Sequence, residues 1–297
     1  MLFRSYNPVG YFRLGLLYRL MRKYEPALEN FEKALAINPR LMDVFSNVIL
    51  VYAAQKEFET ALKTCDQKLK EIEEVPVLSA FVYNIKGELY LAQRKLPEAE
   101  AAFVAALEKN PDFLKPYYSL SKIYLSEGEH EKSIEQFKTI LEKNPNQTRP
   151  HMLLGTIYEG QKQLDLAEKH YREALAINPD FAPAANNLAY LLSSQNRNID
   201  EALALAKKAK EKLPDDPNVA DTLGYLYLRK GLYDMAIGEF SDSLKKLPDN
   251  PIIHYHLGLA LHQKGNLEGA RTELEKALSL NDKFEGADEA RKLLGEI

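Results

Sequence analysis

The chain has 297 residues, a formal net charge of −4 and an isoelectric point near 6.0. This slightly acidic balance provides no global basic field for nucleic acid, so no nucleic-acid partner is expected. No run of about 18 apolar residues occurs, and we therefore expect no membrane insertion. The arginines within the first helix-like stretch and the lack of a cleavage-site pattern argue against a signal peptide. The single cysteine excludes an internal disulfide.

A spaced set of residues recurs with a period of about 34 residues. Between Ala80 and Pro111 the set is Tyr83, Gly87, Tyr90, Ala99, Phe103 and Ala106. The same offsets hold from Pro8 and from Thr148. Apolar residues recur at intervals of three and four, which indicates helices with one buried stripe. A proline closes most units because it disfavours continuation of a helix. The sequence therefore predicts an array of helix pairs.

We expect eight units over residues 8–282. They begin near Pro8, Met42, Ala80, Leu114, Thr148, Ala182, Pro217 and Pro251. The second unit has Ile49 where a small residue is expected and runs four residues long. We therefore predict that its second helix is one turn longer and that its packing is looser. The sixth unit carries one extra residue in its inter-helix loop, within residues 193–200.

Two positions in each unit hold small residues. The eighth position of the first helix is most often glycine, which is a poor helix former, so its recurrence points to a packing need. The twentieth position, in the second helix, is alanine or serine. We interpret the two small residues as facing each other, so that the two helix backbones approach closely. In the seventh unit this pairs Gly224 with Ala236.

The two ends of the chain have different sequence patterns. Residues 283–297 have apolar residues on one stripe, including Phe284 and Leu293, and are expected to form a helix that caps the last unit. Met1–Asn7 leads directly into the first unit, where Phe3, Tyr6 and Tyr11 would leave apolar surface uncovered. Either a partner covers this surface, or the chain is part of a longer one.

This spacing resembles the tetratricopeptide repeat family, and the resemblance covers most of the chain. It implies an all-α fold, an α-solenoid in which helix-turn-helix repeats form a right-handed superhelix. The phrases NNLAY and DTLGYLYLRKG are similar to those of bacterial repeat arrays. The resemblance also implies that the first helices of the repeats line a concave groove.

A search for chemistry predicts no catalytic residue, no metal site and no cofactor. His254, His256 and His262 lie on different faces of one helix, unlike the i, i+4 pair of a helical zinc site. His151 and His254 occupy the aromatic fourth position of their units, where a core ring is expected. Ser119 and Lys122 match the S-x-x-K pattern, but the partner motifs of serine acyl enzymes are missing.

The groove positions of the first helices supply the candidate binding residues. Basic side chains in the middle units favour an acidic segment or a carboxylate, tyrosines offer rigid rings, and asparagines can pair with a peptide backbone. Alternatively, the tyrosines serve only packing, and the basic residues only form a solvated face. The candidates are Asn47, Asn84, Lys115, Tyr118, Lys122, Arg149, Asn187, Tyr190, Tyr225 and Tyr255.

The sequence therefore predicts a non-enzymatic scaffold that binds a peptide or helical segment of a partner protein in its groove. Two alternatives remain open. The chain could self-assemble by stacking through its N-terminal face, as a homo-oligomer, or it could be an accessory module of an enzyme complex. A direct enzymatic role is the least supported. The lone cysteine fits a reducing compartment such as the cytoplasm, while the periplasm stays open if an upstream signal or anchor was removed.

Overall fold

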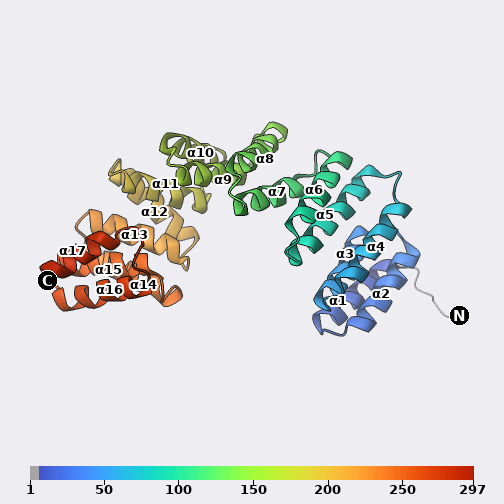
Figure 1. Ribbon diagram of the computed structural model, residues 1–297, viewed down its shortest axis with the longest axis horizontal. Helices are drawn as coiled ribbons and strands as arrows, with labels where there is room; N and C mark the ends of the chain where they lie inside the picture. Colours follow the sequence, from blue (N-terminus) through green and yellow to red (C-terminus); the bar gives the residue numbers. More distant parts are fainter. Residues whose placement is uncertain (1–6) are drawn as a thin grey trace. The chain divides into compact units, whose positions relative to one another are not determined.

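The computed structural model describes residues 7–297, which form seventeen helices and no strand. The expectations for Phe3 and Tyr6 lie outside these residues. The fold is an all-α solenoid, and consecutive helices pack side by side within residues 7–143 and within residues 144–297 (Figure 1). Within residues 7–297, no helix combines the length and the apolar character that crossing a membrane requires.

The chain divides into two compact units, the first ending at Lys143 and the second spanning Asn144–Ile297. The helices of the first unit are α1 (Pro8–Leu20), α2 (Tyr24–Ile37), α3 (Met42–Ala54), α4 (Phe58–Glu71), α5 (Pro76–Ala92), α6 (Leu96–Lys109), α7 (Leu114–Ser126) and α8 (His130–Lys143). Four helix pairs, here called repeats one to four, make up this unit. The first helix of one repeat packs on the first helix of the next at α1 with α3 and at α3 with α5.

The second unit contains repeats five to eight and a final single helix. Its helices are α9 (Thr148–Gly160), α10 (Leu164–Ile177), α11 (Ala182–Ser194), α12 (Ile199–Lys212), α13 (Pro217–Arg229), α14 (Tyr233–Lys246), α15 (Pro251–Lys264), α16 (Leu267–Leu280) and α17 (Ala287–Glu296). The first helices α9, α11, α13 and α15 pack on one another in order. They thus bring side chains of four different repeats to one surface.

Side-chain caps and prolines define where the repeats begin. Asn7, Asp216 and Asn250 each accept a hydrogen bond from backbone N–H groups of the helix that follows, and a proline occupies the first turn of each of these helices. This arrangement satisfies N–H groups that have no partner within the helix. Other repeats close on asparagine turns, in which the side chain accepts from the N–H two residues later, as at Asn38 and Asn178.

The extra turn of helix lies in a different place from the predicted one. The expectation that the second helix of repeat two is longer is wrong, because α4 has the same 14 residues as α2. Instead α5 has 17 residues and begins at Pro76, which takes the first helical turn, where proline is tolerated. Ser79 donates to the carbonyl of Ile72 and ties this early start to the preceding turn. The extra residue of repeat six does lie in the loop between α11 and α12, where Asn196 and Asn198 have positive φ.

In four repeats, the glycine that recurs in the first helix faces an aromatic ring and not the predicted alanine. A Cβ atom placed on Gly155 would lie 2.5 Å from the ring of Tyr171, and one on Gly87 would lie 2.4 Å from that of Phe103. These rings follow the buried alanine by four residues, one turn along the same face of the second helix. The first helix therefore approaches a large ring, and the glycine is the residue that leaves room for it. Gly15 and Gly224 meet Phe31 and Phe240 in the same way.

Repeat two exchanges the sizes of these two positions. Ile49 stands where the other repeats have a small residue, and Cys65 stands where five of them have an aromatic ring. Both side chains are buried in one apolar cluster with Phe45 and Val82. The expectation of looser packing is confirmed, because α3 and α4 approach each other less closely than the two helices of any other repeat, as the bulk of Ile49 requires. Burial raises the pKa of the Cys65 thiol to about 12, so the thiol stays protonated at neutral pH.

Helix α17 covers the last repeat. Phe284, Ala287 and Ala290 are buried against α15 and α16, in a cluster that includes Leu274 and Tyr255. Gly286 has a positive φ, and its close approach to the Tyr255 ring would leave no room for a Cβ atom. The C-terminal segment thus provides an apolar cover for α15 and α16.

Candidate ligand groove

A hollow of about 370 Å³ opens within the second unit and is here called the groove. Its floor comes from the first helices α9, α11, α13 and α15, with one ring from α10. Most of the side chains on its walls carry an amide, hydroxyl, carboxylate or imidazole group, and the isoleucines of α15 are the aliphatic ones. The residues used below are Thr156, Glu159, Tyr171, Asn186, Asn187, Tyr190, Asp221, Ile252 and His256. A hollow with several hydrogen-bonding groups and some apolar surface is suited to hold a ligand that itself has hydrogen-bonding groups.

Adjacent asparagines of α11 give the groove its hydrogen-bonding capacity. Asn186 is 9% exposed, and its Oδ1 atom is buried without a hydrogen-bond partner. A buried acceptor of this kind loses its bonds to water without gaining others, which costs about 1–3 kcal/mol. Asn187 donates from Nδ2 to Oγ1 of Thr156 on α9 at 3.4 Å, a long and weak contact. Asn187 can therefore exchange this contact for a bond to a ligand, whereas the oxygen of Asn186 is enclosed and has to turn toward the groove to do so.

Tyrosine rings border these amides. Tyr190 lies one turn after Asn186 on α11 and is 39% exposed. Burial of the rest of its side chain is the main cause of the raised pKa of its hydroxyl group. A partly exposed tyrosine ring of this kind is suited to contact a partner.

The two carboxylates described next are already engaged within the groove. Glu159 Oε2 accepts a bond of 2.6 Å from the hydroxyl of Tyr171. Burial raises the pKa of Glu159, although the bond from Tyr171 opposes that shift. Asp221 Oδ1 lies 2.8 Å from Nδ1 of His256, whose ring lies 5.0 Å from that of Tyr225. Each of these carboxylates thus already has a hydrogen-bond partner in the groove.

The predicted binding residues of the first unit lie on three helices. Asn47 on α3 donates to the carbonyl of Asp43, one turn earlier. Asn84 on α5 is buried, and its Oδ1 has no hydrogen-bond partner, as at the equivalent Asn186. Lys115, Tyr118 and Lys122 share one face of α7, where both lysines are exposed and Tyr118 packs edge-on against Phe137.

The predicted residues of the second unit have different surroundings. Asn187 and Tyr190 line the groove, and Tyr225 is half-buried beside His256. Arg149 is exposed on α9. The basic residues that the sequence analysis grouped together are thus divided between the two units.

Tyr255 requires a correction. It is only 6% exposed, its ring lies 5.5 Å from that of Phe284, and its hydroxyl donates to Glu289 of α17. The side chain of Tyr255 packs beneath the C-terminal segment, which covers the ring, and so it does not line the groove. The sequence did predict a cap, but not that Tyr255 would lie beneath it.

Sequence reasoning missed a group of possible metal ligands. His151, His170 and Glu173 form the one such cluster among residues 7–297. The search for an i, i+4 pair within one helix could not find it, because the residues come from both helices of repeat five. Burial is the main cause of the lowered pKa of His151. The signal was present in the second helix, where His170 and Glu173 are three residues apart and so share a face.

Ser119, the serine of the S-x-x-K match, has a different partner from Lys122. Its hydroxyl group donates to the carboxylate of Glu88 at 3.3 Å.

Solved structures with low sequence identity share this fold. A chain of the APC/C hetero-tetramer Cut9-Hcn1 is 19% identical with a TM-score of 0.66; the match covers 92% of this chain and 52% of that one. The chain thus spans about half the length of that relative. Pseudomonas aeruginosa pilF is 17% identical with a TM-score of 0.61, over 72% of this chain and 96% of that one. A tetratricopeptide repeat protein from Parabacteroides merdae is 18% identical with a TM-score of 0.58, over 85% and 97%.

Models of the tetratricopeptide repeat match most of the chain. They match residues 8–41 and 149–181, residues 90–157, residues 170–204 and residues 222–294. No curated protein matches it. Proteins built from such repeats serve in general as scaffolds for protein–protein interaction. The matches and the helix pairs agree, and the chain belongs to the tetratricopeptide repeat family.

Proposed function

We propose that the chain is a non-catalytic scaffold whose groove binds an extended peptide segment of a partner protein. The observation that carries this proposal is the Oδ1 atom of Asn186, which is buried and has no hydrogen-bond partner within residues 7–297. When the Asn186 amide turns toward the groove, a peptide N–H can donate to this oxygen and offset the cost of burying it. An extended peptide presents such donors at regular intervals along its backbone, whereas an α-helix uses most of its own N–H groups.

The remaining groove residues fit the same ligand. Asn187 can exchange its 3.4 Å contact with Thr156 for a shorter bond to a peptide carbonyl. Tyr190 provides a partly exposed ring, and the exposed side chain of Ile252 provides an apolar contact for a side chain of the ligand. Interface energy concentrates in a few aromatic anchors and well-packed polar contacts. We therefore expect Asn186, Asn187 and Tyr190 to dominate binding.

An acidic stretch in the same partner would fit the first unit. Lys115, Tyr118 and Lys122 follow an i, i+3, i+7 pattern and so lie on one face of α7. Two exposed lysines flanking a ring attract carboxylates, although exposed charges are screened by salt. Arg149 offers a further exposed cation on α9 of the second unit.

Site-specific photo-crosslinking tests the groove directly. A photo-reactive residue is placed at Asn187, inside the groove, and in a second protein at Lys169, which is exposed on α10 and does not line it. Both proteins are incubated with a partner identified by pulldown with the intact chain. The proposal predicts crosslinks from position 187 to one contiguous segment of the partner and none from position 169. Crosslinks from position 169 alone would contradict it.

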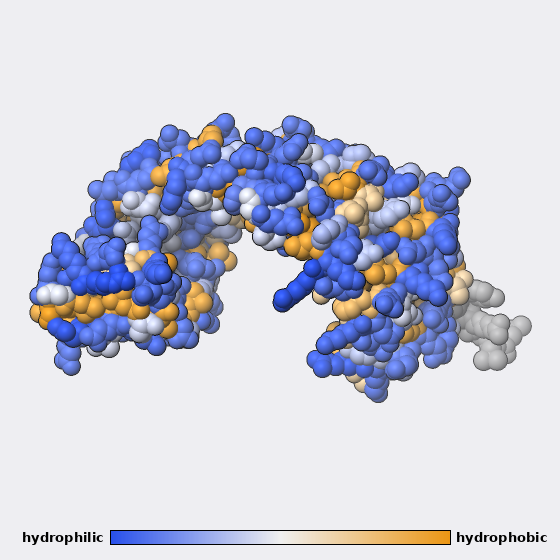
Figure 2. Space-filling model, in the orientation of Figure 1, coloured by the Kyte–Doolittle hydropathy of each residue, from blue (hydrophilic) through white to orange (hydrophobic). Residues whose placement is uncertain are grey.

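Self-association is a second candidate, favoured by the surface of α1. Leu17, Leu20 and Met21 are exposed, with Leu20 at 75%. Figure 2 shows that apolar atoms reach the surface among mainly hydrophilic side chains. A second copy of the chain could cover these residues. Sedimentation at increasing concentration should then show a rise in mass that Leu17→Glu abolishes; a constant mass would rule this candidate out.

A further inference from the structure

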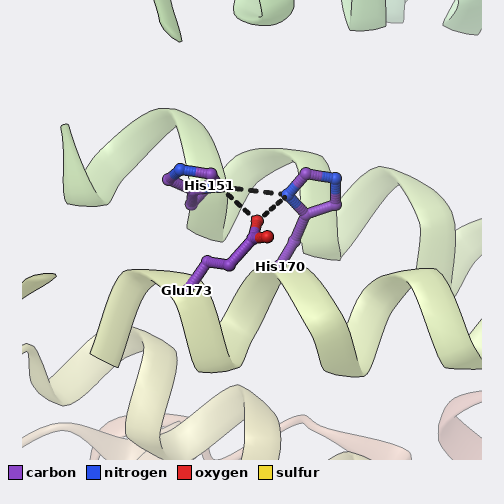
Figure 3. Close-up of side chains that lie close together, drawn as sticks. All are labelled: His151, His170 and Glu173. Atoms are coloured by element: carbon purple, nitrogen blue, oxygen red, sulfur yellow. Dashed lines mark hydrogen bonds and ion pairs between the residues drawn. The ribbon is translucent and has the colours of Figure 1, made fainter. Parts of the chain in front are cut away.

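The most compact group of possible metal ligands in the described residues is His151, His170 and Glu173, here called the histidine cluster. His151 lies on α9, whereas His170 and Glu173 lie one turn apart on α10 (Figure 3). The two helices of repeat five pack closely because Gly155 admits the Tyr171 ring. This packing places His151, the fourth residue of α9, opposite His170 and Glu173 on α10. The cluster is separate from the groove.

Three atoms of the cluster form a nearly equilateral triangle. Nδ1 of His151 lies 3.1 Å from Nδ1 of His170, and Oε2 of Glu173 lies 3.0 Å and 3.1 Å from them. The ring of Tyr158 stacks on His170 at 5.5 Å and fixes its plane. Each histidine side chain is 14% exposed, and that of Glu173 is 38% exposed. The two histidines are thus mostly buried, and solvent reaches the triangle on the side of Glu173.

Hydrogen bonds alone do not satisfy this triangle. An ionised carboxylate only accepts, and each Nδ1 atom carries at most one hydrogen. If both rings donate to Glu173, two N–H donors face each other along the third edge. If one ring donates to the other, the acceptor ring turns a lone pair toward the carboxylate oxygen. Every arrangement therefore leaves one unfavourable edge, whereas a cation at the centre would accept a lone pair from all three atoms.

The dimensions of the triangle suit a small divalent ion. Bonds of about 2.0–2.1 Å in a tetrahedral zinc site place neighbouring ligand atoms about 3.3–3.4 Å apart. The three atoms therefore need to separate by only about 0.3 Å to reach that spacing. Two imidazoles and one carboxylate are ligands preferred by zinc and related transition metals, while calcium and magnesium prefer oxygen ligands throughout.

We propose that His151, His170 and Glu173 bind a zinc-type divalent transition-metal ion that links α9 to α10 and keeps a coordination position open toward the solvent. Three protein ligands with an open position form the arrangement of a site that binds a further group. Water fills that position in the isolated chain. Lys169 lies 3.9 Å from Oε1 of Glu173 and leaves Oε2 directed at the histidines.

Repeat eight provides an internal control for this site. His254 occupies the same position as His151, and Glu273 occupies that of His170. Nδ1 of His254 lies 2.5 Å from Glu273, and its Nε2 lies 2.9 Å from the carbonyl of Pro248, so both ring nitrogens are engaged. Lys276 stands at the position of Glu173 and would repel a cation. A metal ion should therefore bind repeat five and not repeat eight.

Repeat three supplies substitutions that the fold tolerates. The positions of His151, His170 and Glu173 are held there by Tyr83, Ala102 and Ala105. His151→Tyr and His170→Ala thus remove a ligand and insert the residue that another repeat already packs. His254→Asn serves as the matched control, because it removes a histidine from the equivalent position in repeat eight.

The test is a calorimetric titration of the metal-stripped full chain with zinc chloride, followed by thermal melting with and without zinc. The wild type and His254→Asn should bind one equivalent and melt at a higher temperature with zinc. His151→Tyr and His170→Ala should lose at least about tenfold in affinity, since even outer-shell changes cost that much. Equal affinity of the wild type and His170→Ala would overturn the proposal.

Cobalt provides a readout that needs no variant. The wild-type chain loaded with Co²⁺ should give the intense visible absorption of a four- or five-coordinate ion, because only a few protein ligands surround the metal. An absorption spectrum like that of hydrated Co²⁺ would contradict the site. Binding of zinc without crosslinking of a partner would leave the groove proposal wrong and the metal site intact.

Discussion

The two units use equivalent repeat positions for different surfaces. On α7, in the first unit, the second, fifth and ninth positions hold Lys115, Tyr118 and Lys122, and both lysines are exposed. On α11, in the second unit, the fifth and ninth positions hold Asn186 and Tyr190, which line the groove. The glycine, the ring and the buried alanine that hold the helices together recur in both units. The packing positions thus determine the framework of helix pairs, and the remaining positions determine the chemistry of the surface that a ligand meets.

The largest effect is expected where the framework is closest packed. Gly155→Ala places a methyl group 2.5 Å from the Tyr171 ring, and such overpacking costs about 1–3 kcal/mol of unfolding free energy. Gly160→Ala is the matched control in the same helix, because nothing lies within 4 Å of its Cβ position. It should be neutral or stabilise the helix by up to about 1 kcal/mol.

Hydrogen exchange distinguishes the two units in this experiment. Gly155→Ala should lower amide protection in repeats five to eight, and Gly87→Ala should do so in repeats one to four. Equal loss of protection in both units from either substitution would show that the division at Lys143 has no energetic meaning.

The sequence predicted the framework well, because the helix pairs depend on local periodicity and on residues that recur at fixed offsets. It did not predict which ring fills the space beside each glycine, since that depends on how two helices turn toward each other. It also placed Tyr255 in the groove, because the position of a terminal cap cannot be read from one repeat. The histidine cluster combines residues of two helices, so spacing along one helix did not reveal it.

Repeat two differs from the other repeats of the first unit at its two packing positions, Ile49 and Cys65. Cys65→Phe alone should destabilise the chain by about 1–3 kcal/mol, because Ile49 leaves no room for a ring. Adding Ile49→Gly restores the arrangement of the other repeats and should recover part of this loss. A double-mutant cycle of denaturant unfolding measures the coupling, which we expect to be favourable by about 0.5–3 kcal/mol. Strict additivity would mean that the two positions do not compensate each other.

Tyr255→Phe separates packing from binding in the second unit. Loss of the hydroxyl bond to Glu289 should lower the unfolding free energy by about 1 kcal/mol. Peptide affinity should stay unchanged, because the ring lies beneath the C-terminal segment. Unfolding and binding titrations of the same protein check both points, and weaker binding at unchanged stability would restore Tyr255 to the groove.

Glu159 should give the smallest effect, which depends on pH. Burial raises its pKa in the folded chain above the ordinary value, so the protonated form favours folding at low pH. This contribution is present below the unfolded pKa and is lost as pH rises through the folded pKa. Glu159→Gln cannot ionise, so the unfolding free energy of the wild type should fall relative to the variant between about pH 4 and pH 7. A constant difference over that range would show that Glu159 is not desolvated.

The proposal to test most directly is that the groove of the second unit binds an extended peptide through Asn187 and Tyr190. Calorimetry with the partner segment found by crosslinking tests it, using Asn187→Ala and Tyr190→Ala against the matched control Asn47→Ala, which changes the equivalent position of repeat two. Each groove substitution should weaken binding by about 1–3 kcal/mol, and the control should bind like the wild type. Wild-type affinity in both groove variants, or an equal loss in Asn47→Ala, would contradict the claim.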